Sequence, residues 1–218
     1  MTSIADIRSQ PEAQAAFTWD KLWALFDGNA ERMNLAHECI DRHAGKGSAV
    51  SIKFADGRLE HHDFAKLAEL TGRFANWLVR RGVAKGERVA IMLEPSLGFY
   101  VGMFGAVKRG AIGVPLFTLF GEEAVEYRLA NAEASAVITD MANVPKILAV
   151  RDRLPNLRTV IVIGAGAHGA QFLDWDRLLT AASDGFKTVD TDAEDPALLI
   201  YTSGTTGQPK GALHAHRM

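Results

Sequence analysis

The chain reads Tyr201-Thr-Ser-Gly-Thr-Thr-Gly-Gln-Pro-Lys-Gly211 near its C-terminal end, directly after the apolar run at residues 197–201. A short apolar run of this kind is typical of a buried strand. Glycines let backbone N–H groups approach an anion because they lack a Cβ, hydroxyls add hydrogen-bond donors, and Lys210 adds a positive charge. We therefore expect a phosphate-binding loop at the end of a buried strand.

The order of residues in this loop differs from that of a Walker A loop, in which glycine precedes the lysine and Ser or Thr follows it. Pro209 and Gly211 occupy those two places here. The whole stretch, continued by His216-Arg217, instead resembles the signature of the adenylate-forming superfamily. That superfamily comprises acyl-CoA synthetases, the adenylation domains of nonribosomal peptide synthetases and beetle luciferases. A plain polar linker is disfavoured, because linkers seldom place Pro-Lys-Gly after a strand-like run.

The resemblance extends from about Met33 to the end of the chain, and residues 35–43, 105–115 and 124–140 are most similar to acetyl- and medium-chain acyl-CoA synthetases. It implies an AMP-forming reaction in which a carboxylic acid, ATP and coenzyme A give acyl-CoA, AMP and pyrophosphate. Lys210 would act as an electrostatic stabiliser, and no residue of the chain would be a nucleophile or general base. The residues assigned to the ATP phosphates are Thr202, Ser203, Gly204, Thr205, Thr206, Gly207, Gln208, Pro209 and Lys210.

In the superfamily this loop is followed by the adenine- and Mg²⁺-binding motif, the acyl pocket, the ribose-binding aspartate and a small C-terminal domain with the adenylation lysine. The chain has 218 residues, so the resemblance implies the N-terminal portion only. Mg²⁺ ligands are expected downstream, and none is assigned here. We expect these residues alone to lack adenylation activity, and a non-catalytic fragment that serves as an interaction module is an open alternative.

An alternation of apolar strand patterns with helical patterns characterises the middle of the chain. Alternation at this period predicts an α/β fold with a mainly parallel sheet flanked by helices. By the resemblance, this is an incomplete N-terminal part of the adenylate-forming large domain, with residues 197–201 as a central strand. Lys108, near the end of one helix, is expected to complement the helix dipole. The other strands are expected at residues 88–93, 111–115, 136–139 and 159–163.

Local signals mark several element ends. Residues 49–54 alternate in hydrophobicity and precede Asp56-Gly57, which predicts a hairpin with a type I′ turn. Asp63 and Gly82 are placed to begin and to end a long amphipathic helix.

The chain divides into residues 1–45, expected to form a helical arm, and residues 46–218, expected to form the partial α/β domain. Trp19 and Trp23 lie close together on the arm. Two large aromatic side chains on so short a segment imply that the arm docks on a larger body.

Composition limits the classes of partner and compartment. Lysine and arginine number 24 against 26 acidic residues, and this net charge of −2 produces no field that would attract nucleic acid or an anionic membrane. The N-terminus lacks the apolar core of a signal peptide, and no apolar run is long enough to span a bilayer. We expect a cytoplasmic protein whose single cysteine, Cys39, packs inward as a small hydrophobe.

A second glycine-rich motif, Gly164-Ala-Gly-Ala-His-Gly169, follows the expected strand at residues 159–163 and matches the GxGxxG pattern. It makes an NAD-type dinucleotide-binding oxidoreductase an alternative function. A dinucleotide site also needs a second strand that ends in an acidic residue about 20 positions on. Asp184 has that spacing, but the residues before it have a helical pattern. We therefore predict a surface loop that binds no ligand.

Overall fold

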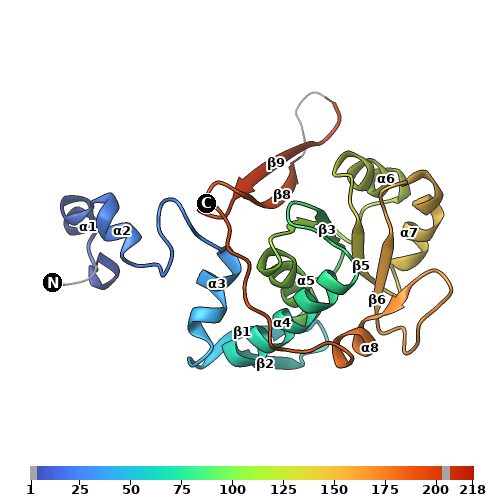
Figure 1. Cartoon of the computed structure of the whole chain (residues 1–218), viewed down its shortest axis with the longest axis horizontal. Coiled ribbons are helices and arrows are strands. Elements are labelled where there is room, and N and C mark those ends of the chain that lie inside the picture. The colour runs from blue at the N-terminus through green and yellow to red at the C-terminus, as the bar shows by residue number, and fades with distance from the viewer. Residues whose placement is uncertain (1–3, 203–206) are drawn as a thin grey trace.

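The computed structural model describes residues 4–202 and 207–218. Within these residues a seven-stranded sheet has the order β7-β6-β5-β3-β4-β8-β9, and helices cover both of its faces (Figure 1). Neighbouring strands are parallel except β8 and β9, which are antiparallel. The strands are β1 (Ser48–Lys53), β2 (Leu59–Asp63), β3 (Arg88–Ile91), β4 (Ile112–Pro115), β5 (Ala136–Asp140), β6 (Thr159–Ile163), β7 (Leu173–Asp174), β8 (Pro196–Thr202) and β9 (Lys210–Ala215).

The helices belong to the arm and to two layers around the sheet. They are α1 (Gln10–Ala16), α2 (Trp19–Trp23), α3 (Leu35–Cys39), α4 (Phe64–Arg80), α5 (Leu97–Lys108), α6 (Glu122–Asn131), α7 (Val144–Val150) and α8 (Trp175–Thr180), with 3₁₀ turns η1 (Ile4–Asp6), η2 (Asp41–His43) and η3 (Arg151–Arg153). Successive residues of β3 point to opposite faces: Val89 and Ile91 pack with α4, α5 and α8, whereas Ala90 packs with α6 and α7. The predicted α/β class is confirmed.

β3 takes the central position in the sheet. Residues 197–201, expected to be a central strand, form most of β8, which is an inner strand but lies next to the edge strand β9. The reason is that the crossovers through α5 and α6 place β4 and β5 on the two sides of β3, and β8 adds outside β4.

Most predicted element ends are confirmed. The Asp63 carboxylate accepts a hydrogen bond from the Lys66 N–H and caps α4, and Gly82 with φ +71° ends that helix. The β1–β2 hairpin also forms as expected. Its turn is not type I′, because that turn needs positive φ at both central residues and only Gly57 has it.

Two expectations for side chains of the arm were wrong. Trp19 is 65% exposed and packs edge to face on Phe17 at 5.4 Å, and α1 and α2 contain no buried residue. The arm docks on the domain, as expected, but through α3 and η2. Cys39 is exposed. Helix α3 turns Ala36 and Glu38 inward instead, and Cys39 is its last residue.

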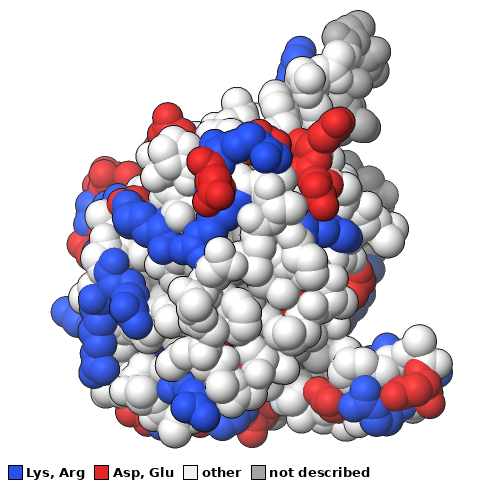
Figure 2. All heavy atoms as spheres, turned by 90° about the vertical axis from the view of Figure 1, so that its right-hand side faces the viewer, with Lys and Arg blue, Asp and Glu red and all other residues white. Residues whose placement is uncertain are grey.

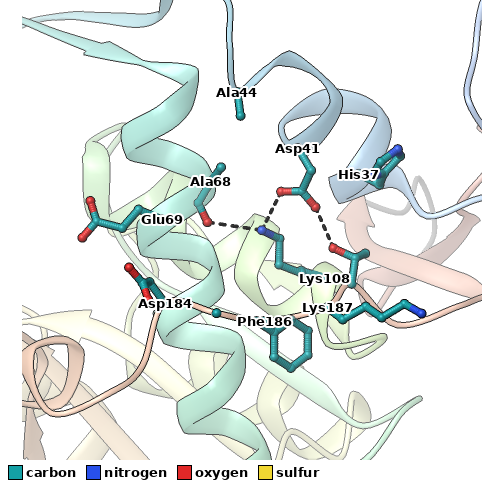
Figure 3. Close-up of a pocket in the computed structure, with 11 residues that line it drawn as sticks. His37, Asp41, Ala44, Ala68, Glu69, Lys108, Asp184, Phe186 and Lys187 are labelled. Atoms are coloured by element: carbon teal, nitrogen blue, oxygen red, sulfur yellow. Dashed lines mark hydrogen bonds and ion pairs between the residues drawn. The ribbon is translucent and has the colours of Figure 1, made fainter.

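Lys108 lies in the last turn of α5, as predicted, and is buried, which was not predicted. It is 3% exposed, and its ammonium lies 2.6 Å from Asp41 of η2 and donates to the Ala68 carbonyl of α4. Asp41 in turn accepts a hydrogen bond from the Thr188 hydroxyl at 2.6 Å (Figure 3). The arm, α4, α5 and the segment before β8 therefore meet at one buried ammonium.

We predict that Lys108→Met lowers the free energy of unfolding by about 3 kcal/mol, because it leaves the partly buried Asp41 carboxylate without its cation. The double variant Lys108→Met/Asp41→Asn should lose less than the sum of the two single variants. Urea unfolding of the four proteins measures this coupling.

Lys66 provides the matched control, since its ion pair with Glu69 joins side chains that are 48% and 35% exposed. Lys66→Met should cost under about 1 kcal/mol. Equal losses for Lys66→Met and Lys108→Met would contradict a structural role for the buried pair.

Candidate functional site

The predicted phosphate-binding loop connects two antiparallel strands. β8 and β9 pair from Pro196 opposite Ala215 up to Thr202 opposite Lys210. The hairpin extends beyond the body of the domain (Figure 1), and Figure 2 shows basic and acidic side chains interspersed on the face below it. Thr202 and Lys210 therefore stand opposite each other at the base of the loop, and a β-hairpin was not foreseen here.

The structure brings together the described members of the predicted site. Thr202, Gly207, Gln208 and Lys210 are exposed, and Pro209 is half-buried. Within the described part of the chain Lys210 has no ion-pair partner, so its charge faces solvent. Ser203, Gly204, Thr205 and Thr206 were assigned to the same phosphates and lie outside the described residues.

Helix α6 holds the strand that leads into the loop. The Tyr201 hydroxyl donates to the Asn131 side-chain oxygen at 2.7 Å and approaches the Arg128 carbonyl at 3.3 Å. Burial raises the pKa of Tyr201, which keeps the phenol protonated and able to donate. The arginine side chain of the same helix lies over the Tyr201 ring, 5.7 Å from its centroid.

His216 holds the strand that leaves the loop. It is 1% exposed, and its Nδ1 accepts a hydrogen bond of 3.0 Å from the Leu35 N–H at the start of α3. Burial lowers the pKa of His216 to about 4, partly offset by Asp195 and reinforced by Lys85. The neutral ring is required, because Nδ1 can accept this bond only when it carries no proton.

An apolar cavity of about 310 Å³ lies beside the base of the hairpin. Residues 93–95 after β3, residues 115–118 and Phe120 after β4, and Ile200 and Tyr201 of β8 line it. The segments at the carboxyl ends of the parallel strands β3, β4 and β8 meet at this cavity. Open α/β sheets bind ligands outside the carboxyl ends of their strands.

The glycine motif at residues 164–169 lies apart from this site. Gly164, Gly166 and His168 are exposed, as predicted, and α8 begins only at Trp175, after the short strand β7. Asp184 lies in an irregular segment, 3.8 Å from Arg73. The strand that a dinucleotide site would need before Asp184 is not present in this fully described region.

Neither a metal site nor a membrane-spanning helix is found among the described residues. No cluster of three or more His, Cys, Asp and Glu side chains there could hold a metal ion. None of the helices in residues 4–202 and 207–218 is long and apolar enough to cross a membrane.

Sequence reasoning found the loop but missed the residues that support it. Tyr127 of α6 donates a hydrogen bond to the Pro209 carbonyl at 3.0 Å, Tyr201 bonds back to α6, and His216 bonds to α3. Each partner lies between 70 and 181 positions away in the chain. His216 and Tyr201 did stand inside the quoted signature, which was the available signal.

We predict that acid weakens the fold through His216. The pKa of His216 is about 4 in the folded protein against an ordinary value of 6.5, so the unfolded chain binds the proton more tightly. The contribution of neutral His216 to the free energy of unfolding is complete above about pH 6.5 and decreases as the pH falls toward 4. His216→Asn keeps an oxygen acceptor for the Leu35 N–H and does not titrate.

Urea unfolding at several pH values between 6.5 and 4 should therefore show a flatter pH dependence for His216→Asn than for the unmodified protein. The exposed His61 offers a control, and His61→Asn should retain the original slope. If the free energy of unfolding of His216→Asn depended on pH as steeply as that of the unmodified protein, His216 would not be the group through which acid weakens the fold.

Known proteins provide an independent comparison. Acetyl-coenzyme A synthetase of Bacillus subtilis (strain 168) is 38% identical over 217 residues, which is 97% of this chain and 38% of that enzyme. The chain thus spans about two fifths of the length of this relative. Among solved structures, an acyl-CoA synthetase of Brucella canis superposes with a TM-score of 0.86 at 30% identity, covering 97% of this chain and 39% of the other.

A second solved structure is also similar to the chain. It is an anthranilate CoA ligase in complex with anthranoyl-AMP, with a TM-score of 0.77, 29% identity, and coverage of 85% of this chain and 35% of that one. Residues 39–218 match the family described as AMP-binding enzyme. The chain belongs to the AMP-binding enzyme family, and the relatives named above are acyl-CoA synthetases and CoA ligases.

Proposed function

We propose that the full-length protein is an AMP-forming acid–CoA ligase that converts a carboxylic acid, ATP and coenzyme A to acyl-CoA, AMP and pyrophosphate. The observation that carries this proposal is the exposed hairpin tip, where Lys210 has no ion-pair partner in the described residues and Gly207 and Gln208 are open to solvent. Membership of the AMP-binding enzyme family and the CoA-ligase relatives support it.

The proposed role of the tip follows from charge. When a carboxylate attacks the α-phosphorus of ATP, negative charge develops on the departing pyrophosphate. Donors aimed at that group stabilise the transition state more than the ground state. Lys210 and the backbone N–H groups of Gly207 and Gln208 are the described donors beside the loop, whereas the hydroxyl of Thr202 donates to the Lys210 carbonyl. They bind and stabilise the departing group without forming a bond to it.

The position of the tip suits a reaction between a nucleotide and an organic acid. The apolar cavity next to Tyr201 offers space for an organic group close to the hairpin. The relatives are named for different acids, acetate in one and anthranilate in the other. We therefore assign a class of substrate, a small carboxylic acid, and no individual acid.

Mg²⁺ and coenzyme A enter the proposal as partners of the full-length protein. The described residues hold no cluster able to bind a metal ion, so we derive no step of the reaction through Mg²⁺. Coenzyme A is assigned by the kinship with CoA ligases.

The proposal is tested by carboxylate-dependent exchange of labelled pyrophosphate into ATP, measured on the full-length protein with a panel of short aliphatic and aromatic acids. Exchange that depends on one of these acids is expected, followed by thioester formation when coenzyme A is added. Lack of exchange with every acid, together with binding of another macromolecule, would favour an interaction module instead.

We predict that Lys210→Ala slows the pyrophosphate-forming half-reaction of the full-length protein by about 10- to 150-fold, because a hydrogen bond to a charged group contributes about 1.5–3 kcal/mol. Thioester formation from a supplied acyl-adenylate should keep its rate, since pyrophosphate has left by then. The two half-reactions are measured separately, by pyrophosphate exchange and by acyl transfer to coenzyme A.

Lys53→Ala is the matched control, because Lys53 is an exposed lysine on β1, in the separate two-stranded sheet. It should leave both half-reactions unchanged. If Lys210→Ala reduced the two half-reactions equally, the lysine would support the fold or position coenzyme A, and its assignment to the departing phosphates would be wrong.

A further inference from the structure

Helix α6 contacts both strands that flank the phosphate-binding loop. Tyr127 donates through its hydroxyl to the Pro209 carbonyl at 3.0 Å, next to the start of β9. One turn later, Asn131 accepts the hydroxyl of Tyr201 from β8 at 2.7 Å. Residues at positions i and i+4 lie on the same face of a helix. A single helical face therefore bonds to the strand that enters the loop and to the residue at which the chain leaves it.

The hairpin needs such support because its backbone connection to the parallel strands is limited. In the described residues β4 pairs with β8 at Gly113 opposite Leu198, three residues before Tyr201. Beyond that pair, β8 is bonded to β9, and an isolated two-stranded hairpin is marginally stable in water. The placement of the described ends of the two strands thus depends on side-chain contacts, those with α6 among them.

The bond from Tyr127 is placed to affect Lys210 directly. Pro209 has a fixed φ and lacks an N–H group, so its carbonyl is the polar backbone group that remains for an anchor. This carbonyl belongs to the peptide bond that joins Pro209 to Lys210. Fixing it restricts the backbone from which the lysine side chain extends.

Arg128 stabilises the part of α6 that contacts the hairpin. Its guanidinium lies 3.9 Å from the centroid of the Phe120 ring, and its Nη1 donates to the Ala124 carbonyl at 2.8 Å. The residue is 8% exposed. Cation–π packing of a buried guanidinium holds the ring and the helix together.

We propose that Tyr127 is a positioning residue that holds the Pro209–Lys210 backbone in place for the ATP phosphates. The inference rests on the proposed function, because it assigns to Tyr127 an effect on the adenylation half-reaction. Tyr127 acts through Lys210 and does not itself touch the phosphates. It is half-buried on α6, a helix to which the sequence pattern attached no functional residue.

The test is Tyr127→Phe in the full-length protein, a change that removes one hydroxyl and keeps the ring. We expect kcat/KM for ATP in the exchange assay to fall about 3- to 10-fold, because Tyr127 acts through the contact that Lys210 makes with the departing pyrophosphate. The KM for the carboxylic acid and the rate of acyl transfer from a supplied acyl-adenylate should remain unchanged. Amide hydrogen exchange in a peptide spanning residues 207–213 should become faster.

Tyr100→Phe is the matched control. Tyr100 is also half-buried on a helix of the domain, and its hydroxyl has no hydrogen-bond partner among the described residues. It should change neither the kinetics nor the amide exchange. A melting temperature of Tyr127→Phe close to that of Tyr100→Phe would separate positioning from general destabilisation.

The outcomes distinguish failure of the positioning role of Tyr127 from failure of the proposed enzyme function. Unchanged amide exchange and an unchanged kcat/KM for ATP in Tyr127→Phe would overturn the positioning role while leaving the enzyme assignment intact. Equal losses in both half-reactions, with a lowered melting temperature, would also overturn it in favour of a structural role. Absence of carboxylate-dependent exchange in the unmodified protein would overturn the proposed function and, with it, this role.

Discussion

The parallel pairing of β3 with β4 on one side and β5 on the other is the constraint on which the rest of the structure depends. β3 is buried on both faces, so its alternate residues must each meet a helical layer. The two crossovers therefore leave in opposite directions, and the carboxyl ends of β3 and β4 border a cavity. β8 adds beside β4, and this places Tyr201 on the wall of that cavity.

The junction between β4 and β8 also explains why the hairpin is held by side chains. A Cβ atom on Gly113 would lie 3.2 Å from the Leu198 side chain and would meet the sulfur of Met103, so glycine permits the close approach of β8 and α5. Backbone pairing there is short, and the strands continue outward as a hairpin. Hydrogen bonds from α6 and from the arm hold the hairpin in place where a longer pairing between β4 and β8 would otherwise do so.

Features that depend on neighbours in the sequence were predictable, and features that depend on distant partners were not. The cap at Asp63 and the stop at Gly82 need only a few adjacent residues, and both were confirmed. The burial of Lys108 was not predictable, because its partner Asp41 lies on a different element and charged residues are rarely fully buried unless paired. The exposure of Trp19 has a local cause instead, because its ring packs on Phe17, which is two positions away in the sequence.

The same distinction applies to the candidate site. The loop sequence shows its chemistry directly, because glycines, hydroxyls and a lysine are the groups that bind phosphate. Its supports are neutral side chains, Tyr127, Tyr201 and His216, whose type does not indicate a function in the sequence. Neutral anchors have a physical advantage here. A carboxylate at the same place would pair with Lys210 and compete with the phosphates for its charge, whereas phenol and imidazole fix the backbone and leave that charge available.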